Sequence, residues 1–340
     1  MVRRVVLFLA VVVVALVGYR AVQAAAPSTI ASIDIDSSGR DDAVIFRPSE
    51  GKWYVLQAPY SSAFAISSAS AVANLETLLP PGDYNGDGKT DIGTYRGVTL
   101  GSGAPAGVWT IGLGPTFNTA TALSWGVAGD TPLPADWDGD GRLDVAVFRP
   151  SEGKLYVLQG GSNFTAAFTL TWGAAGDIPI PADLDNDGRT DFGVYRRSES
   201  RIYVLQGGTG FKSAFIITTL GLPTDNYVPG DYDGDGKTDL AAYTPTTLGP
   251  AALAGTWTIA QGGNNFTSQF SKSWGVAGDV PAPGDFDGDG RLDIAVFRPS
   301  EGRFFVLQGG TNYTSAFVII WGANGDIPIG VRNPVRATTF

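Results

Sequence analysis

The chain has 340 residues and a formal net charge of −10, and 44% of its residues are hydrophobic. That hydrophobic fraction is typical of a folded protein and excludes a disordered chain. The absence of cysteine and histidine excludes disulfides, Ser-His-Asp and Cys-His catalysis, and histidine-ligated zinc. The acidic balance, without a basic patch or tail, argues against nucleic acid as a partner.

The first residues have the pattern of a targeting segment. Arg3 and Arg4 precede an apolar run of about 15 residues, shorter than the roughly 20 residues that a membrane span needs. Val22 and Ala24 fit the small-residue rule for cleavage after Ala24. We therefore expect residues 1–24 to be a secretory signal peptide and the mature chain, without a membrane span, to be secreted or held at the cell surface. An uncleaved membrane anchor is the alternative.

A nine-residue string rich in aspartate and glycine recurs six times along the chain. It reads DYNGDGKTD from Asp83 and DWDGDGRLD from Asp136, and its weakest copy is DIDSSGRDD from Asp34. A spacing of about 50 residues is typical of arrays and propellers, in which each repeat is one supersecondary unit. The six repeats start near residues 34, 83, 136, 183, 231 and 285.

Each repeat has four short segments that we expect to form strands. An apolar stretch such as 178–182 leads into the aspartate string, and an alternating segment such as 144–150 follows the string. A Ser-Glu-Gly turn then leads to a third segment, 155–161, and another turn leads to a fourth, 167–173. These segments are rich in β-branched and aromatic residues and show no helical period. We therefore predict an all-β fold, a single β-propeller of six four-stranded blades, over residues 28–334.

Two features concern the ring as a whole. Repeats two and five carry Gly/Ala/Pro-rich inserts, 97–107 and 244–255, between their second and third strands. Repeats one and four lack the Trp-Gly pair that ends the fourth strand elsewhere, so the ring resembles a three-blade block duplicated once. The two inserts would then lie on opposite sides of the ring. Either residues 29–33 or residues 326–330 could supply the strand that closes it.

The aspartate string has the spacing of a cation-binding loop. In the third copy, Asp136, Asp138, Asp140 and Asp144 occupy positions 1, 3, 5 and 9, and Arg142 at position 7 can offer its backbone carbonyl. Several hard oxygen donors in a flexible loop favour Ca²⁺ over Mg²⁺, and the lack of nitrogen and sulfur ligands argues against zinc and copper. Most of the 33 acidic residues lie in these strings, where packed carboxylates repel one another without a cation.

We therefore predict up to six structural Ca²⁺ ions, one per repeat; loops that merely form Asp/Gly turns are the alternative. The strings are not EF-hands, because position 12 holds Val147, Val194 or Val296 instead of a bidentate Glu. Ser38 and Asn85 replace aspartate in the first two copies, and we expect the first site to be the weakest. The predicted ligands are Asp34, Asp36, Ser38, Arg40 and Asp42; Asp83, Asn85, Asp87, Lys89 and Asp91; Asp136, Asp138, Asp140, Arg142 and Asp144; Asp183, Asp185, Asp187, Arg189 and Asp191; Asp231, Asp233, Asp235, Lys237 and Asp239; and Asp285, Asp287, Asp289, Arg291 and Asp293.

Taken together, the strings resemble a known family. The pattern DGDG-x-x-D, followed by AVFRP, YVLQ and WG-x-x-GD-x-P, resembles the FG-GAP/VCBS repeats of bacterial secreted proteins, which are related to the calcium-binding blades of integrin α-subunits. The Phe-Gly and Gly-Ala-Pro strings of the family are eroded, since FRPS and GDIP or GDVP stand in their places. The resemblance implies a calcium-binding propeller that serves adhesion, ligand binding or scaffolding, often outside the cell.

Three other kinds of side chain recur in the repeats, and the simplest interpretation is that they pack between blades or form turns. The tryptophans of the Trp-Gly pairs could stack on sugars, but we expect them to pack between blades; they are Trp125, Trp172, Trp274 and Trp321. The glutamates of the turns of Ser-Glu-Gly type could serve glycoside chemistry, but we interpret them as solvated turn residues; they are Glu50, Glu152, Glu199 and Glu301. The glutamines after the third strands could bind a ligand, but we interpret them as turn residues; they are Gln57, Gln159, Gln206, Gln261 and Gln308.

The repeats carry no catalytic constellation, and we predict that the protein is not an enzyme. The favoured hypothesis is a secreted, monomeric calcium-binding propeller that acts as an extracellular binding, adhesion or scaffold module. A multivalent carbohydrate-binding lectin, in which linked weak sites gain avidity, is the alternative. A propeller-fold polysaccharide lyase or hydrolase is a third hypothesis. The expected partner is an extracellular protein or glycan.

Overall fold

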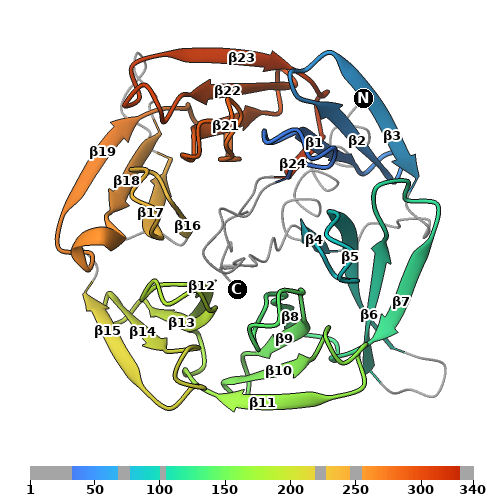
Figure 1. The fold of residues 1–340 in the computed structure, drawn as a ribbon, viewed down its shortest axis with the longest axis vertical. Helices are drawn as coiled ribbons and strands as arrows, with labels where there is room; N and C mark the ends of the chain where they lie inside the picture. Colours follow the sequence, from blue (N-terminus) through green and yellow to red (C-terminus); the bar gives the residue numbers. More distant parts are fainter. Residues whose placement is uncertain (1–32, 68–76, 100–104, 219–226, 246–254, 330–340) are drawn as a thin grey trace, which may run out of the picture.

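The computed structural model describes residues 33–67, 77–99, 105–218, 227–245 and 255–329, which form a ring of six four-stranded antiparallel sheets (Figure 1). The predicted all-β propeller of six blades is confirmed. The expected signal peptide, residues 1–24, lies outside the described residues. Within the described ranges the one helix is the short 3-10 helix η1 (Gly262–Asn264), and none is long and apolar enough to cross a membrane.

The blades follow one another along the chain, and in each the strands run from the ring axis outward (Figure 1). Blade one contains β24 (Ile327–Ile329), β1 (Ala43–Arg47), β2 (Lys52–Gln57) and β3 (Ser62–Ser67), and blade two contains β4 (Thr77–Gly82), β5 (Asp91–Thr99), β6 (Pro105–Gly112) and β7 (Ala120–Ser124). Blade three contains β8 (Thr131–Pro132), β9 (Val145–Arg149), β10 (Lys154–Leu158) and β11 (Ala167–Thr171), and blade four contains β12 (Ile178–Ala182), β13 (Asp191–Arg196), β14 (Arg201–Leu205) and β15 (Ala214–Thr218). Blade five contains β16 (Tyr227–Gly230), β17 (Asp239–Thr244), β18 (Thr256–Ala260) and β19 (Gln269–Ser273), and blade six contains β20 (Val280–Pro281), β21 (Ile294–Arg298), β22 (Arg303–Leu307) and β23 (Ala316–Ile320).

The innermost strands are short, apolar and rich in proline. All five residues of β12 are buried, and two of them are Pro179 and Pro181. Proline has no N–H to donate, and an edge strand tolerates it because one of its sides has no partner strand. In the third strands burial alternates, as in β10, where Leu155 and Val157 are buried between more exposed neighbours. Alternate side chains point to opposite faces of a sheet, and the buried ones form cores with the adjacent blades.

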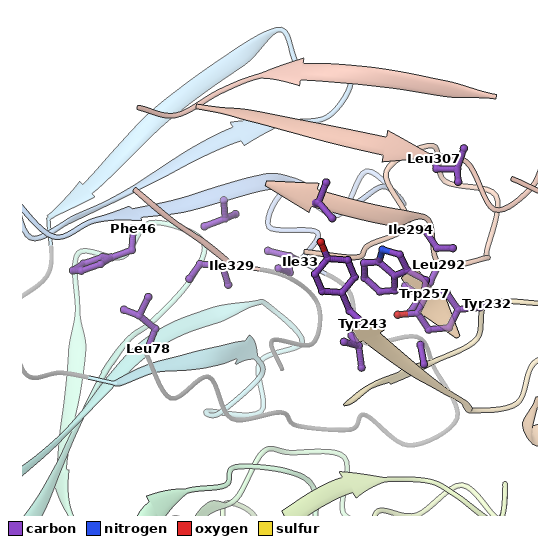
Figure 2. Packing of buried hydrophobic residues seen from close by; sticks show 14 of the residues in the cluster. Ile33, Phe46, Leu78, Tyr232, Tyr243, Trp257, Leu292, Ile294, Leu307 and Ile329 are labelled. Carbon is purple, nitrogen blue, oxygen red and sulfur yellow. The ribbon is translucent and has the colours of Figure 1, made fainter. Parts of the chain in front are cut away.

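The sequence offers two segments for the strand that closes the ring, residues 29–33 and residues 326–330. In the structure the C-terminal segment supplies this strand. β24 pairs antiparallel with β1, with Pro328 opposite Ile45. Figure 2 shows Ile329 within a hydrophobic cluster that also contains Leu78 of blade two and Ile294 of blade six. Blade one is therefore built from both ends of the described chain, and its sheet is complete only when the ring has closed.

A buried carboxylate joins the first blade to the last. Asp41 is 1% exposed, and its two oxygens accept the N–H groups of Ile33 and Asp285, both at 2.6 Å. The N–H of Asp41 donates in turn to Asp285 O at 2.9 Å. Asp41 is the eighth residue of the first aspartate string, where the other copies have threonine or leucine. Its side chain therefore ties the loop of blade one to the loop of blade six.

The tryptophans of the Trp-Gly pairs link neighbouring blades. In each case the indole N–H donates to a backbone carbonyl on the third strand of the following blade, at 2.9 to 3.4 Å. The pairs are Trp125 with Tyr156, Trp172 with Tyr203, Trp274 with Phe305 and Trp321 with Tyr54. The predicted packing of these side chains between blades is confirmed.

The two predicted inserts belong to blades that face each other across the ring (Figure 1). In blade two the insert is partly strand, because β5 and β6 continue into it and pair Gly97 with Gly107 and Thr99 with Pro105. The expectation of an insert between the strands is therefore wrong at its two ends, where the paired strands extend further than in blades one, three, four and six. The middle of that insert, 100–104, and most of the insert of blade five, 246–254, lie outside the described residues.

Candidate metal centres

The six aspartate strings lie on one face of the ring. In blades two to six each string joins the innermost strand to the second strand, and in blade one the string leads directly into the second strand, β1. The sheets run in the same sense around the ring. The hairpins between third and fourth strands lie at this same end, whereas the Ser-Glu-Gly turns and the Trp-Gly segments lie at the other end. All six loops and their neighbouring hairpins therefore share one surface.

Local backbone geometry folds each string into a compact loop. In blade three, Gly139 and Gly141 have φ of 79° and 90°, in the left-handed region that favours glycine. The chain then turns around Asp136, whose Oδ1 accepts the N–H of Gly139 at 2.7 Å and of Asp140 at 3.0 Å. Its Oδ2 accepts the N–H of Gly141 at 2.8 Å. The alternating aspartates are thereby folded around a common centre.

The ninth residue of each string anchors the loop to the rest of its blade. Asp144 is fully buried, and it accepts the N–H of Trp137 at 2.9 Å and the N–H of Gly160 at 2.7 Å. The first bond fixes the start of the loop, and the second bond fixes the hairpin between third and fourth strands. The same two bonds occur in all six blades, with Asp42, Asp91, Asp144, Asp191, Asp239 and Asp293 as acceptors.

The structure brings carboxylates together in five of these described loops. In each, one oxygen from each of three aspartates lies within 4.8 Å of the other two. Blades one, three, four and five use positions 1, 3 and 9, and blade six uses positions 1, 3 and 5; the triads are Asp34, Asp36 and Asp42; Asp136, Asp138 and Asp144; Asp183, Asp185 and Asp191; Asp231, Asp233 and Asp239; and Asp285, Asp287 and Asp289. In blade two Asn85 stands at position 3, and its Oδ1 accepts the N–H of Asp87 at 2.8 Å. Several aspartate clusters could therefore hold a metal ion.

Four of the glutamines that follow the third strands contact these clusters, in addition to the turn role that the sequence predicts. Gln261 makes both contacts, because its Oε1 accepts the hydroxyl of Ser268 at 2.9 Å. In blades three to six the Nε2 of each glutamine donates to an Oδ2 of the aspartate at position 3; the glutamines are Gln159, Gln206, Gln261 and Gln308. In blade one, Gln57 has the expected turn role, since its Oε1 accepts the hydroxyl of Ser62 at 3.0 Å. The recurrence of Gln-Gly-Gly was a sequence signal for this contact, but it does not reveal the partner.

The second glycine of Gln-Gly-Gly also belongs to the site. A Cβ atom at Gly161 would lie 1.6 Å from an oxygen of Asp140, the fifth residue of the loop. The same close approach recurs in blades four, five and six, at Gly208, Gly263 and Gly310. Only glycine therefore leaves room for the position-5 carboxylate beside the hairpin.

We expect the Gln159→Leu substitution to weaken cation binding by the loop of blade three by about tenfold, which is the effect typical of losing an outer partner of a metal ligand. Leucine is the residue that blade two has at this place, Leu113, so the change should leave the hairpin intact. Hydrogen exchange of residues 136–144 across a cation titration measures the effect. Gln57→Leu is the matched control, because Gln57 contacts Ser62 and not an aspartate. Equal effects of the two substitutions would show that the contact with Asp138 does not matter.

Burial makes the ninth aspartate difficult to ionise without a cation. It raises the pKa of Asp144, Asp191 and Asp239 to about 7 and that of Asp293 to about 8. The bonds from backbone N–H groups oppose this effect, and the neighbouring carboxylates add to it. In blades one and two the same causes raise the pKa of Asp42 and Asp91 to about 6. A cation beside these groups would favour their ionised form.

The donor set suits a hard divalent cation. Every predicted side-chain ligand offers oxygen, and the triads of blades one, three, four and five combine buried carboxylates with more accessible ones. In blade six, Asp287 Oδ1 is buried and has no hydrogen-bond partner among the described residues, although Asp287 Oδ2 accepts from Gln308. A buried acceptor without a partner is costly, and a bound cation would satisfy it. The residues therefore fit a bound calcium ion.

A second repeated cluster, which sequence reasoning missed, lies at the opposite end of the blades. Arg149 donates from Nε and Nη2 to the two oxygens of Asp130, at 2.8 and 2.9 Å, and from Nη1 to Glu152 at 3.0 Å. The hydroxyl of Tyr156 donates to the same glutamate. Blades one, four and six repeat the bidentate pair, in Arg47 with Asp326, Arg196 with Asp177 and Arg298 with Asp279. The glutamates of the Ser-Glu-Gly turns thus support an arginine, in accord with their interpretation as solvated turn residues.

The fold and the loops define the class of protein: a six-bladed β-propeller with an oxygen-rich loop in every blade. The family model described as FG-GAP-like repeat matches residues 136–194 and 183–242, and the model described as FG-GAP repeat matches residues 277–320. The chain is an FG-GAP repeat protein. A comparison with curated proteins gave no match. FG-GAP repeats are typical of extracellular proteins. In general, the FG-GAP propeller fold indicates a module that serves binding or adhesion.

Proposed function

We propose that the protein is an exported, non-catalytic calcium-binding propeller that acts outside the cell as a binding, adhesion or scaffold module. One observation carries the proposal: successive blades hold carboxylate triads within 4.8 Å on the same face of the ring. Oxygen donors alone, in loops of this kind, favour Ca²⁺ over zinc and copper and over the smaller Mg²⁺. The recurrence of a carboxylate triad in five of the described loops supports a structural role for the cation.

When bound, calcium supplies positive charge between carboxylates that otherwise repel one another. The loops position these carboxylates through backbone N–H groups, as in the three bonds to Asp136. Binding to the folded chain alone stabilises it by mass action. The rigid ring would then present its surface loops to an extracellular protein or glycan.

Calorimetric titration of the chain from residue 25 with Ca²⁺, and separately with Mg²⁺, tests the proposal. We expect several Ca²⁺ ions per chain and much weaker binding of Mg²⁺, which requires a regular octahedral site. A chain that takes up no Ca²⁺, or that binds Mg²⁺ equally well, would refute the calcium assignment.

The first site should bind calcium more weakly than the third. Ser38 replaces the position-5 aspartate there, and its hydroxyl lies 3.4 Å from Asp34 Oδ1 and 3.5 Å from Arg40 O. The first loop therefore has one carboxylate fewer than the third at the predicted ligand positions. We expect Asp36→Ala to reduce total calcium binding less than Asp138→Ala in the same titration. Equal losses would contradict the ranking of the two sites.

A lectin would need sugar-stacking platforms other than the tryptophans of the Trp-Gly pairs. Those side chains are half-buried, and each donates its indole N–H to the next blade. They therefore support the closed ring, and the scaffold or adhesion role is the function that we propose.

A further inference from the structure

The six aspartate loops contact one another around the ring. At every blade interface a donor at position 7 or 8 of one loop bonds an acceptor at position 1, 3 or 4 of the loop before it, at 2.8 to 3.4 Å. In ring order from blade one, the bonds are Thr90 Oγ1 to Asp34 O, Leu143 N to Asp83 O, Arg189 Nη1 to Asp138 O, Thr238 N to Asn186 Oδ1, Leu292 N to Asp231 O and Asp41 N to Asp285 O. We call this set of bonds the loop belt.

Side chains at position 7 pack the same interfaces. A Cβ atom at Gly86, position 4 of the second loop, would lie 2.0 Å from Nε of Arg142 in the third loop. A Cβ atom at Gly234 would lie 2.0 Å from Nε of Arg291 in the loop that follows. At these two interfaces each loop therefore leaves its neighbour little room to move independently. The arrangement also accounts for glycine at position 4 beyond its positive φ.

The belt bonds lie next to the predicted ligands. Position 8 stands between the carbonyl of position 7 and the carboxylate of position 9, and position 1 contributes the first carboxylate. A bond from position 8 of one loop to position 1 of the preceding loop therefore connects the end of one site to the start of another. The atoms that form these bonds are not the predicted ligand atoms, because the acceptors at positions 1 and 3 are backbone carbonyls whereas the ligands there are carboxylates.

We propose that the loop belt couples the six sites, so that a cation bound in one blade increases the affinity of the adjacent blades. This inference rests on the proposed calcium binding. Ordering a loop costs conformational entropy, and a loop already held by an ordered neighbour has less to lose. Coupling between sites typically changes affinity by about 5- to 150-fold. For one shared hydrogen bond we expect the lower end, about fivefold.

The interface between blades four and five allows a clean test. There the acceptor is a side chain, Asn186 Oδ1, which lies 2.8 Å from the N–H of Thr238. Asn186 has φ of 61° at position 4, where the second, third, fifth and sixth loops have glycine. Asn186→Gly therefore removes the acceptor and keeps the backbone conformation, and it alters no predicted ligand. Asn163→Gly is the matched control, because Asn163 has φ of 52° in a hairpin outside the belt.

The experiment follows hydrogen exchange of residues 183–191 during a Ca²⁺ titration of the full chain. Asp233→Asn disables the site of blade five. We expect it to raise the calcium midpoint of the blade-four loop about fivefold in the otherwise natural chain. The same increase should persist with Asn163→Gly and disappear with Asn186→Gly. The comparison removes any direct electrostatic effect of Asp233, since that effect is common to all backgrounds.

The outcomes separate the two proposals. The coupling would be overturned if Asp233→Asn left the calcium midpoint of the blade-four loop unchanged, or if its effect on that midpoint persisted in the Asn186→Gly background. Either result would leave calcium binding itself intact. Residues 183–191 that gain no protection from Ca²⁺ in the natural chain would overturn calcium binding in that blade, and the coupling with it. Near-ultraviolet circular dichroism verifies that each variant is folded.

Discussion

Chelation of calcium at neutral pH is expected to lower the midpoint of thermal unfolding of the mature chain by more than about 10 °C. A ligand present at 100 times its dissociation constant stabilises a folded protein by about 2.7 kcal/mol per site. Five of the described loops gather carboxylate triads, so several such contributions add. For a domain of about 300 residues, 1 kcal/mol shifts the midpoint by roughly 1.6 °C. Loss of even half the sites would then exceed the stated shift.

Scanning calorimetry of the chain in Ca²⁺, in Mg²⁺ and in excess chelator measures this effect. Glu152→Gln is a suitable control, because Glu152 bonds Arg149 at the end of the blade opposite the loops. Its response to chelator should match that of the natural chain. An identical midpoint with and without calcium would rule out a structural role for the cation.

Acidification is expected to act in opposite directions with and without calcium. In excess chelator, the free energy of unfolding should rise as pH falls from 8 to 5. The reason is the ninth aspartate: its pKa is about 7 in folded blade three, compared with an ordinary value of 3.8. Between these values the folded chain holds a proton that the unfolded chain has lost, so stability decreases as pH rises. A pKa of about 7 in place of 3.8 corresponds to as much as about 4 kcal/mol per carboxyl.

With calcium present, the sign reverses. The cation binds the ionised carboxylates, and protons compete with it as pH falls below about 7. The free energy of unfolding in calcium should therefore decrease on acidification. Its difference from the free energy of unfolding in chelator should become smaller. Denaturant unfolding at pH 5, 6, 7 and 8 measures both curves. Asp293→Asn removes the carboxyl with the highest of these values, about 8, and should flatten the chelator curve most near that pH. Parallel curves with and without calcium would contradict the argument.

The candidate sites illustrate which contacts are local. The loop around Asp136 is built from bonds between residues three to five apart, and its glycines at positions 4 and 6 are visible in the string. Such short-range geometry follows from the sequence pattern, because a tight turn needs particular residues at particular places. The convergence of the aspartates at positions 1, 3 and 9 could therefore be predicted.

Other functional contacts could not be predicted in the same way. Gln308 meets Asp287 across 21 residues, Arg149 meets Asp130 across 19, and Asp285 meets Asp41 across 244. The sequence does show that most of these residues recur in equivalent positions of the repeats, and that Asp41 departs from the repeat. It does not show which residues they contact. Their partners depend on the register between strands and on the closure of the ring, and a one-residue change of register would place each side chain on the other face.

The sequence by itself determined the repeat, the number of blades, the alternation of the strands and the oxygen-rich chemistry of the loops. These properties depend on residue types and on spacings within one blade, where the backbone geometry is local. Tertiary structure decided how the ring closes, through β24 and Asp41, and that each loop bonds the next one around the ring. Those contacts join residues from different blades, and only the packing of complete sheets against one another brings them within bonding distance.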